Sequence, residues 1–322
     1  MTAKIHDILI MLPWPASFRF QYEHLIRAAY PTLKITTVST LDETRVELPN
    51  AEIFMAFGAA LTEDVFEGSQ RLKWVHAFGT GVDGIVDQPH LGRDVIVTST
   101  RGIHGAPLSE VAILHMLAMV RDFPRSVRAR DNHVYDRFRI KVLHKKRVGI
   151  LGVGLIAEDL APRLAALGMH VVGITRTPRD LPGFHSFAPR DDLTASVADL
   201  DFLVLLIPLE DATREIVNAQ VLGAMKPGSY LVNIARGGVL DEAALIAALK
   251  SGHLAGAALD ATQKEPLPAD DPLWDAPNLI LTPHNGGFYD TYADDSIEQI
   301  VGNIRRFQEG RFDQMINRET RT

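Results

Sequence analysis

The stretch Arg147-Val-Gly-Ile-Leu-Gly152-Val-Gly154-Leu-Ile-Ala157 decides how this chain folds. An apolar run typical of a buried strand leads into a G-x-G-x-x-A pattern, and a helical pattern follows. In such a turn Gly152 permits the tight bend, Gly154 lets the backbone approach a pyrophosphate, and Ala157 lets the helix pack on the strand. A plain strand-to-helix turn can use the same glycines. A second strand at His170–Ile174 nevertheless favours a dinucleotide-binding unit whose helix N-terminus faces the phosphates.

Strand-like runs alternate with helical patterns on both sides of this turn, which predicts an α/β fold with parallel sheets. The expected strands are Asp7–Leu12, Leu33–Val38, Glu52–Phe57, Trp74–Phe78, Val95–Thr98, Arg147–Leu151, His170–Ile174, Asp201–Ile207, Ser229–Ile234, Gly256–Leu259 and Leu279–Thr282. The expected helices include Phe18–Ala29, Thr62–Gly68, a long helix Leu108–Arg130 opened by Pro107, and Asp294–Gln308. The pattern alone leaves open which lobe the last helix joins.

Length and composition narrow the class of protein. A chain of 322 residues with 46% apolar and 23% charged residues is ordinary for a folded protein of about two domains. The net charge of −7 argues against nucleic acid or an anionic membrane as the main partner. The absence of cysteine excludes disulfides, thiolate catalysis and cysteine-based metal sites, and we expect no metal.

The N-terminal stretch is interpreted as a first strand and not as a signal peptide, because Asp7 interrupts its apolar run and Pro13 ends it. No apolar run approaches the ~20 residues that span a bilayer. A cytoplasmic enzyme or regulator is therefore expected.

The segment Thr175-Arg176-Thr177 ends the strand that lies about twenty residues beyond the glycine loop, where an NAD-binding unit carries Asp or Glu. Such an acid accepts hydrogen bonds from the ribose hydroxyls and repels a 2′-phosphate. Here two hydroxyls and a guanidinium take its place, with Arg179 as a second charge, and these groups donate to phosphate oxygens. The segment predicts a preference for NADP(H), with NAD(H) possible. Alternatively, Arg176 is a solvated loop residue and both cofactors are accepted.

Three further stretches each begin at the C-terminal end of a predicted strand, where an open parallel sheet places its ligand crevice. They are Asn233-Ile-Ala-Arg236-Gly-Gly, Asp260-Ala-Thr-Gln-Lys-Glu265-Pro, and Thr282-Pro-His284-Asn-Gly-Gly. Converging there, the three charged side chains suit the reduction of a 2-keto acid. The Arg would anchor the carboxylate, the His would donate a proton to the carbonyl oxygen, and the Glu would orient the His. Taken one at a time, the Arg could be part of a surface ion pair, the Glu a turn residue and the His a loop histidine. The occurrence of all three together favours the catalytic interpretation.

These motifs resemble the D-isomer-specific 2-hydroxyacid dehydrogenase family nearly end to end. The resemblance extends to Leu72-Lys-Trp-Val, Gly79-Thr-Gly-Val-Asp83, Ile207-Pro-Leu with Thr213, and Pro272-Leu-Trp274 with Pro277-Asn278. It implies two doubly wound parallel-sheet lobes. A Rossmann cofactor lobe, residues 104–285, would be inserted into a flavodoxin-like substrate lobe made of residues 1–103 and 286–322.

The resemblance also implies roles for individual residues. Arg236, Glu265 and His284 would be catalytic, and Thr80, Gly81 and Val82 would bind the substrate together with Arg236 and His284. Together with the strand-end residues Thr175, Arg176 and Thr177 argued above, the positions expected to contact the cofactor are Gly152, Gly154, Leu155, Ile156, Ile207, Pro208, Thr213, Ile234, Ala235, Arg236, Asp260, His284 and Gly286. Among them, Asp260 would bind the nicotinamide carboxamide.

The sequence departs from the family pattern at a few points. The third glycine of the loop is Ala157, and the family's frequent Asp-Val-Phe is Asp260-Ala-Thr262 here. Where the family often has a Trp near the end of its dimer-forming arm, the nearest aromatic residue is Tyr135. Core or interface packing is expected for Tyr135, and also for Trp14 and Phe57, in preference to pocket walls.

The expected function is NAD(P)-dependent reduction of a small 2-keto acid, with glyoxylate or hydroxypyruvate favoured by the resemblance. A homodimer built through helix 108–130 and the arm after it is expected as well. One alternative is a dinucleotide-sensing, corepressor-like regulator on the same scaffold, because fold does not fix function. Another is a dehydrogenase of the formate or phosphite type.

Overall fold

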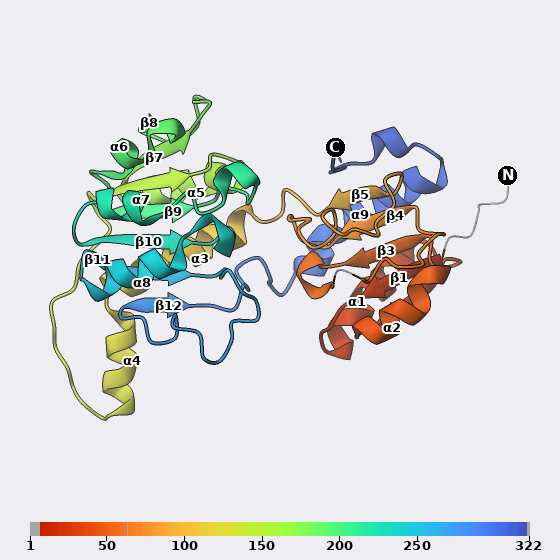
Figure 1. Ribbon diagram of the computed structural model, residues 1–322, viewed down its shortest axis with the longest axis horizontal. Coiled ribbons are helices and arrows are strands. Elements are labelled where there is room, and N and C mark those ends of the chain that lie inside the picture. The colour runs from red at the N-terminus through yellow and green to blue at the C-terminus, as the bar shows by residue number, and fades with distance from the viewer. Residues whose placement is uncertain (1–6, 63, 321–322) are drawn as a thin grey trace. The chain divides into compact units, whose positions relative to one another are not determined.

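The computed structural model describes residues 7–62 and 64–320. Two compact units make up the chain, and Figure 1 shows both. Unit 1 comprises Met1–Ile103 and Asp290–Thr322, and unit 2 comprises His104–Tyr289. Unit 2 is thus inserted into the chain of unit 1, and each unit has a sheet of its own.

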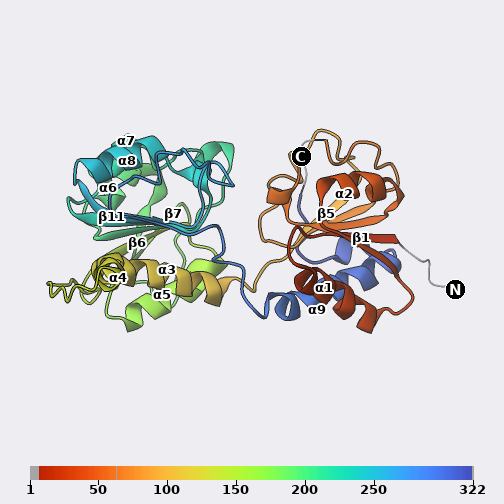
Figure 2. The same ribbon diagram turned by 90° about the horizontal axis from the view of Figure 1, so that it is seen from below.

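Unit 1 is built on a five-stranded parallel sheet with the order β2-β1-β3-β4-β5. Helices α1 and α9 cover one face and α2 covers the other (Figure 2). The inner strands β1, β3 and β4 are buried on both faces, as expected when helices cover both sides of a parallel sheet. The elements are β1 (Asp7–Met11), α1 (Ala16–Ala29), β2 (Lys34–Val38), α2 (Leu41–Glu47), β3 (Ile53–Ala56), β4 (Trp74–Ala77), β5 (Ile96–Ser99) and α9 (Tyr292–Gln308). All five strands confirm the sequence prediction.

The last helix, α9, packs in unit 1 against α1, which answers the question that the sequence pattern left open. The hydroxyl of Tyr22 on α1 lies 3.2 Å from the hydroxyl of Ser296 on α9, and both side chains are buried. The hydroxyl of Tyr30 donates to the carbonyl of Val301 at 3.3 Å. Tyr292, at the start of α9, donates from its hydroxyl to the carbonyl of Phe78 beyond β4.

The helix predicted over 62–68 is wrong at the residues that the structure describes there. The N–H of Val65 donates to Thr62 and the N–H of Glu67 donates to Asp64, so these bonds close turns one residue tighter than an α-helix. The Thr62 hydroxyl also donates to the Asp64 carboxylate at 2.6 Å. Such local side-chain bonds compete with helix formation, and Gly68 ends the run with a φ of +75°.

Unit 2 is built on a seven-stranded parallel sheet with the order β12-β11-β10-β9-β6-β7-β8. Helices α3 and α5 cover one face and α6, α7 and α8 cover the other (Figure 2). The strand order reverses between β6 and β9, which is where a doubly wound sheet opens a crevice for a ligand. The strands are β6 (Arg147–Leu151), β7 (His170–Thr175), β8 (Ser186–Pro189), β9 (Phe202–Leu205), β10 (Ser229–Asn233), β11 (Leu254–Leu259) and β12 (Leu279–Leu281). The helices that follow α3 and α4 are α5 (Leu155–Ala166), α6 (Leu193–Val197), α7 (Ala219–Ala224) and α8 (Glu242–Lys250).

Edge strand β8 was not predicted from the sequence. It pairs in parallel with β7, and none of its residues is buried. Ser186 and Pro189 interrupt the apolar run that would have marked it. The short 3-10 segments are Leu48–Asn50, Gly58–Ala60, Arg190–Asp192, Asp211–Thr213, Gly237–Val239 and Phe312–Gln314.

The single long helix predicted over Leu108–Arg130 is also wrong, because the structure contains two helices. Helix α3 spans Gly105–Val120 and α4 spans Phe123–Asp131, with Asp122 between them at a φ of 48°. Pro124 is the reason: inside a continuous helix its ring would clash with the carbonyl of Val120. At the second position of α4, Pro124 costs no hydrogen bond.

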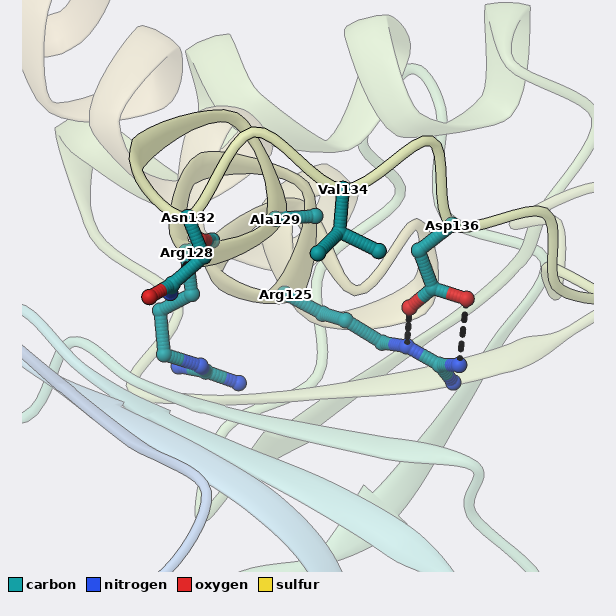
Figure 3. A pocket seen from close by; sticks show the side chains of 6 residues that line it. All are labelled: Arg125, Arg128, Ala129, Asn132, Val134 and Asp136. Atoms are coloured by element: carbon teal, nitrogen blue, oxygen red, sulfur yellow. Dashed lines mark hydrogen bonds and ion pairs between the residues drawn. The ribbon is translucent and has the colours of Figure 1, made fainter.

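Helix α4 and the connection after it extend away from the sheet of unit 2 (Figure 1). No residue of α4 is buried. A hollow of about 390 Å³ lies between α4 and the returning chain, and Figure 3 shows Arg125 crossing it to make two contacts with Asp136 at 2.5 and 3.0 Å. The hollow is lined by Arg125, Arg128, Ala129, Asn132, Val134 and Asp136. This ion pair folds the connection back on α4. No helix in the described part of the chain has the length and apolar character needed to cross a membrane.

Candidate active site

The glycine loop has the geometry that a dinucleotide needs. Gly152 has a φ of +100°, and a Cβ there would lie 2.8 Å from the backbone nitrogen of Ile207 after β9. Only glycine fits at this close approach at the strand-order reversal. A Cβ on Gly154 would meet no atom within 4 Å, whereas Ala157 is fully buried. The loop is therefore packed tightly at Gly152 and open at Gly154. The open side suits a pyrophosphate on the N-terminus of α5.

The first turn of α5 is accessible on this open side. Its N-cap residue, Gly154, makes no side-chain capping bond, and the Leu155 side chain is 63% exposed. The N–H groups of a helix's first turn have no partner within the helix. A phosphate would supply that partner and would meet the positive end of the helix dipole.

The end of β7 carries the groups that were predicted to recognise a 2′-phosphate. Thr175 is the last residue of β7, and Arg176 and Thr177 follow it, both exposed. Arg176 Nε lies 3.3 Å from Asp191 Oδ1. Arg179 lies closer to the glycine loop, because its guanidinium donates to the carbonyl of Val153 at 3.0 Å.

A second contact holds Arg179 in this position: its guanidinium donates to Glu158 Oε1 at 2.8 Å. Sequence reasoning gave Arg179 only a secondary place and did not mark Asp191 at all. Neither contact was visible from spacing, because these loops meet only in the folded structure of unit 2. Two cations therefore stand at the end of β7, and both are held by exposed or half-exposed carboxylates.

Thr213 stabilises the loop after β9 by hydrogen bonds to its backbone. The hydroxyl of this buried residue donates to the carbonyl of Pro208 at 2.7 Å and accepts from the N–H of Glu210 at 2.8 Å. Ile207 is buried where it meets the glycine loop. Thr213 was expected to contact the cofactor. In this structure its hydroxyl fixes the shape of the loop after β9.

Glu265 and His284 form a direct pair. Glu265 Oε2 lies 2.7 Å from His284 Nδ1, and their side chains are 31% and 40% exposed. His284 has a φ of 51°, so the turn after β12 holds it in the left-handed region. Because Nδ1 contacts the carboxylate, Nε2 is the ring nitrogen that can meet a substrate.

The Glu265 carboxyl stays ionised at neutral pH. Burial raises its pKa, but the hydrogen bond and charge of His284, the N–H of Thr262 and the charge of Arg236 together hold the pKa below its ordinary 4.5. The carboxylate is therefore an acceptor, and His284 Nδ1 donates to it. A carboxylate in this position orients the imidazole.

Arg236 comes close to this pair because the backbone after it packs on the loop that carries Glu265. A Cβ on Gly237 would lie 2.0 Å from the carbonyl carbon of Thr262, so only glycine allows this approach. Arg236 Nη1 donates to the carbonyl of Ala235 at 2.8 Å. Asn233, fully buried at the end of β10, donates to the Arg236 carbonyl at 3.0 Å.

Two residues beside Arg236 were missed from the sequence. Asn233 also accepts from the N–H of Ala235 at 3.0 Å, so it fixes the whole turn. A polar residue that ends an apolar strand was its only signal. His104 is buried, and burial together with the charge of Arg236 lowers its pKa to about 4. His104 is therefore neutral at pH 7.

Asp260 supports the turn that carries His284. The buried carboxylate accepts from the Thr282 hydroxyl at 2.5 Å, from the Asn285 N–H at 3.3 Å and from the Gly286 N–H at 2.9 Å. These bonds enclose His284 on both sides along the chain. Ile234 and Ala235, also predicted near the cofactor, are buried at the end of β10.

The predicted carboxylate loop lies in unit 1, directly after β4. The Thr80 hydroxyl donates to the carbonyl of Thr100 at 3.0 Å, which fixes the start of the loop. Among the described residues, none accepts a hydrogen bond from the backbone N–H groups of Gly81 and Val82. Adjacent backbone N–H groups are a common way for proteins to bind an anion.

Residues 113–286 match the family model described as D-isomer specific 2-hydroxyacid dehydrogenase, NAD binding domain. The chain belongs to this family. The sequence interpretation that rested on the glycine loop and on the Arg, Glu and His motifs is confirmed at this level. The two parallel-sheet lobes are confirmed as well.

Curated relatives carry two kinds of name. D-3-phosphoglycerate dehydrogenase of Methanocaldococcus jannaschii is 32% identical over 258 residues, which cover 79% of this chain but 49% of the relative. The chain thus spans about half the length of that relative. Glyoxylate/hydroxypyruvate reductase A of Serratia proteamaculans is 32% identical over 255 residues, which cover 74% of this chain and 78% of the relative.

Solved structures share the whole architecture. A D-isomer specific 2-hydroxyacid dehydrogenase family protein from Aeromonas salmonicida superposes with a TM-score of 0.87 at 30% identity, covering 98% of this chain and 100% of that one. The D-isomer specific 2-hydroxyacid dehydrogenase from Xanthobacter autotrophicus, in complex with NADPH and MES, gives a TM-score of 0.81 at 30% identity, covering 98% of each chain. In the described residues, no group of three or more His, Asp or Glu side chains gathers to hold a metal ion.

Proposed function

We propose that the protein reduces a small 2-keto acid to the 2-hydroxy acid with NADPH, and that glyoxylate or hydroxypyruvate is its substrate. The observation that carries this proposal is the 2.7 Å pair of Glu265 and His284 beside Arg236, in the unit that holds the open glycine loop. The name of the Serratia relative supports the substrate class. The NADPH bound in the Xanthobacter structure supports the cofactor. Unit 2 would bind the dinucleotide.

Each side chain has a separate role in such a reduction. Arg236 binds the substrate carboxylate through its planar fork. His284 Nε2 donates a proton to the carbonyl oxygen, while Glu265 stabilises the charged ring before the transfer. The bound cofactor supplies the hydride. In the reverse direction, neutral His284 accepts the hydroxyl proton.

A panel of 2-keto acids, assayed with NADPH and with NADH, tests this proposal. We expect the highest kcat/KM with glyoxylate or hydroxypyruvate and NADPH. Formate and phosphite oxidation, measured with NADP⁺ and NAD⁺, serve as the comparison. A protein that binds NADPH but shows none of these activities would instead be a dinucleotide-sensing regulator.

We expect Arg236→Lys to lower kcat/KM for the keto acid at least about tenfold, because an ammonium cannot reproduce the planar two-pronged contact. The measurement is steady-state kinetics at saturating NADPH, with Arg214→Lys as the control at an exposed arginine elsewhere in unit 2. Unchanged kinetics in Arg236→Lys would show that another group holds the carboxylate.

We further propose that the protein is a homodimer assembled through α3, α4 and the arm after α4. Large apolar side chains are exposed along this region, namely Leu114, Phe123, Val134, Tyr135, Ile140 and Val142. Between Arg121 and Arg147 the chain also carries ten Lys and Arg residues against three Asp, although its overall charge is −7. A basic, apolar arm on an acidic chain is complementary to a second copy of that chain.

Light scattering tests the dimer. We expect a particle of twice 35.5 kDa at micromolar concentration, and a 35.5 kDa particle would refute the proposal. Val134→Glu should raise the monomer fraction, because it places a charge in the proposed interface. The matched control is Val46→Glu on α2, where the valine is 71% exposed and lies outside the arm.

A further inference from the structure

Helix α3 contains a buried histidine that none of the proposed steps uses. His115 is 2% exposed, and its Nε2 lies 3.4 Å from the hydroxyl of Thr282 at the end of β12. Among the described residues, no group forms a hydrogen bond with its Nδ1. Burial lowers the pKa of His115, although the Asp260 carboxylate opposes the shift. The ring is therefore neutral at pH 7, with a proton on one nitrogen only.

The hydrogen bonds around Thr282 determine which nitrogen carries that proton. A threonine hydroxyl has one hydrogen, and Thr282 uses it to donate to Asp260 Oδ1 at 2.5 Å. The contact with His115 must then have Nε2–H as the donor and the hydroxyl oxygen as the acceptor. The direction runs from His115 to Thr282 to Asp260.

This chain of bonds ends at the turn that holds His284. Asp260 accepts from the N–H groups of Asn285 and Gly286, the two residues that follow His284. The N–H of His284 itself donates to the carbonyl of Thr282 at 3.0 Å. Thr282 therefore takes part in the network twice. Its carbonyl accepts from the N–H of His284 at the start of the turn, and its hydroxyl connects Asp260 to His115 on α3.

We propose that His115 is a positioning residue for His284, acting through Thr282 and Asp260. Its Nε2–H holds the Thr282 hydroxyl in the orientation that donates to Asp260. The contact between His115 Nε2 and the Thr282 hydroxyl is long, so it orients the hydroxyl more than it stabilises the fold. Without that donor, the hydroxyl is free to rotate, and the carboxylate loses one fixed partner. The turn that presents His284 to Glu265 then becomes less well defined. This inference rests on the proposed role of His284 as proton donor.

Two variants of similar size separate the donor from packing. His115→Gln keeps an N–H donor near the position of Nε2, whereas His115→Leu fills the space without one. We expect His115→Leu to lower kcat for the keto acid by about three- to tenfold, the usual effect of one neutral hydrogen bond. His115→Gln should stay within about twofold of wild type, and KM for the keto acid should change little in either variant.

A double-mutant cycle with Thr282→Val tests whether the two residues act through one chain. We expect His115→Leu to cost nothing further once the Thr282 hydroxyl is gone. Equal activity of the Leu variant and wild type, equal losses in Leu and Gln, or full additivity in the cycle would each overturn the inference.

The tautomer of His115 in the wild-type protein provides a readout that needs no activity. Nitrogen-detected NMR of histidine-labelled protein, assigned by the signal that disappears in His115→Gln, should show a neutral ring protonated at Nε2. A ring protonated at Nδ1 would overturn the inference whatever the activities of the variants. If wild type reduces none of the 2-keto acids, the proposed function fails, whereas the tautomer still tests the direction of the bonds.

Discussion

Replacing His284 by Ala is expected to lower kcat for keto-acid reduction by about 10²–10⁴-fold, the range found when a positioned proton donor is removed. The 2.7 Å contact with Glu265 engages Nδ1 and leaves Nε2 to deliver the proton. Binding of NADPH, measured by fluorescence titration, should stay largely intact, because the glycine loop and the end of β7 are unchanged. His24→Ala, at an exposed histidine on α1, is the control and should leave kcat unchanged. Near-normal turnover in His284→Ala would remove this residue from the mechanism.

The pH dependence of the wild-type enzyme gives a second view of His284. Reduction requires the protonated ring and oxidation the neutral ring, so kcat/KM for reduction should fall with rising pH while that for oxidation rises. Glu265 does not contribute to this change between about pH 6 and 9, because its lowered pKa keeps it ionised throughout that range. Opposite trends in the two directions are therefore expected when a side chain donates the proton in reduction, and parallel trends would contradict the assignment.

Most strands of both units were predictable because they are short apolar runs, and central ones such as Phe202–Leu205 are buried on both faces. Strand β8 was not, since an edge strand with Ser186 and Pro189 needs little apolar surface. The break between α3 and α4 was visible in principle at Pro124, but the long apolar run before it concealed it. Patterns of side-chain burial indicate which face of an element is covered more reliably than where the element ends.

The residues of the candidate site also separate into those that the sequence predicted and those that it did not. Arg236, Glu265 and His284 were predictable because parallel strands end at one edge of the sheet, so residues just after those ends converge. Partners contributed by other loops or helices were not predictable, because no spacing in the sequence relates them. Asp191 beside Arg176 and His115 beneath Thr282 are of this kind. The sequence shows which residues carry chemistry, and tertiary packing decides what holds them.

Arg176→Ala is expected to weaken NADPH binding by roughly 10- to 150-fold while NADH binding changes little. A hydrogen bond between charged groups contributes about 1.5–3 kcal/mol, and that fold range follows from it. The pair that Arg176 makes with Asp191 is no obstacle: the two side chains are 58% and 79% exposed, and exposed pairs are weak. A 2′-phosphate, with more charge than one carboxylate, would displace Asp191 at little cost.

Companion variants show which cation recognises the phosphate. Asp191→Ala frees Arg176 and should tighten NADPH by a few fold at most, as the loss of an exposed ion pair allows. Arg179 is held by Glu158 and the Val153 carbonyl, so Arg179→Ala should have the smaller effect on NADPH unless Arg179 leaves those partners. The decisive measurement is kcat/KM for NADPH and NADH with one keto acid in wild type and in Arg176→Ala. A wild-type preference for NADH, or an equal loss for both cofactors in the variant, would show that the hydroxyls and guanidinium after β7 do not select a 2′-phosphate.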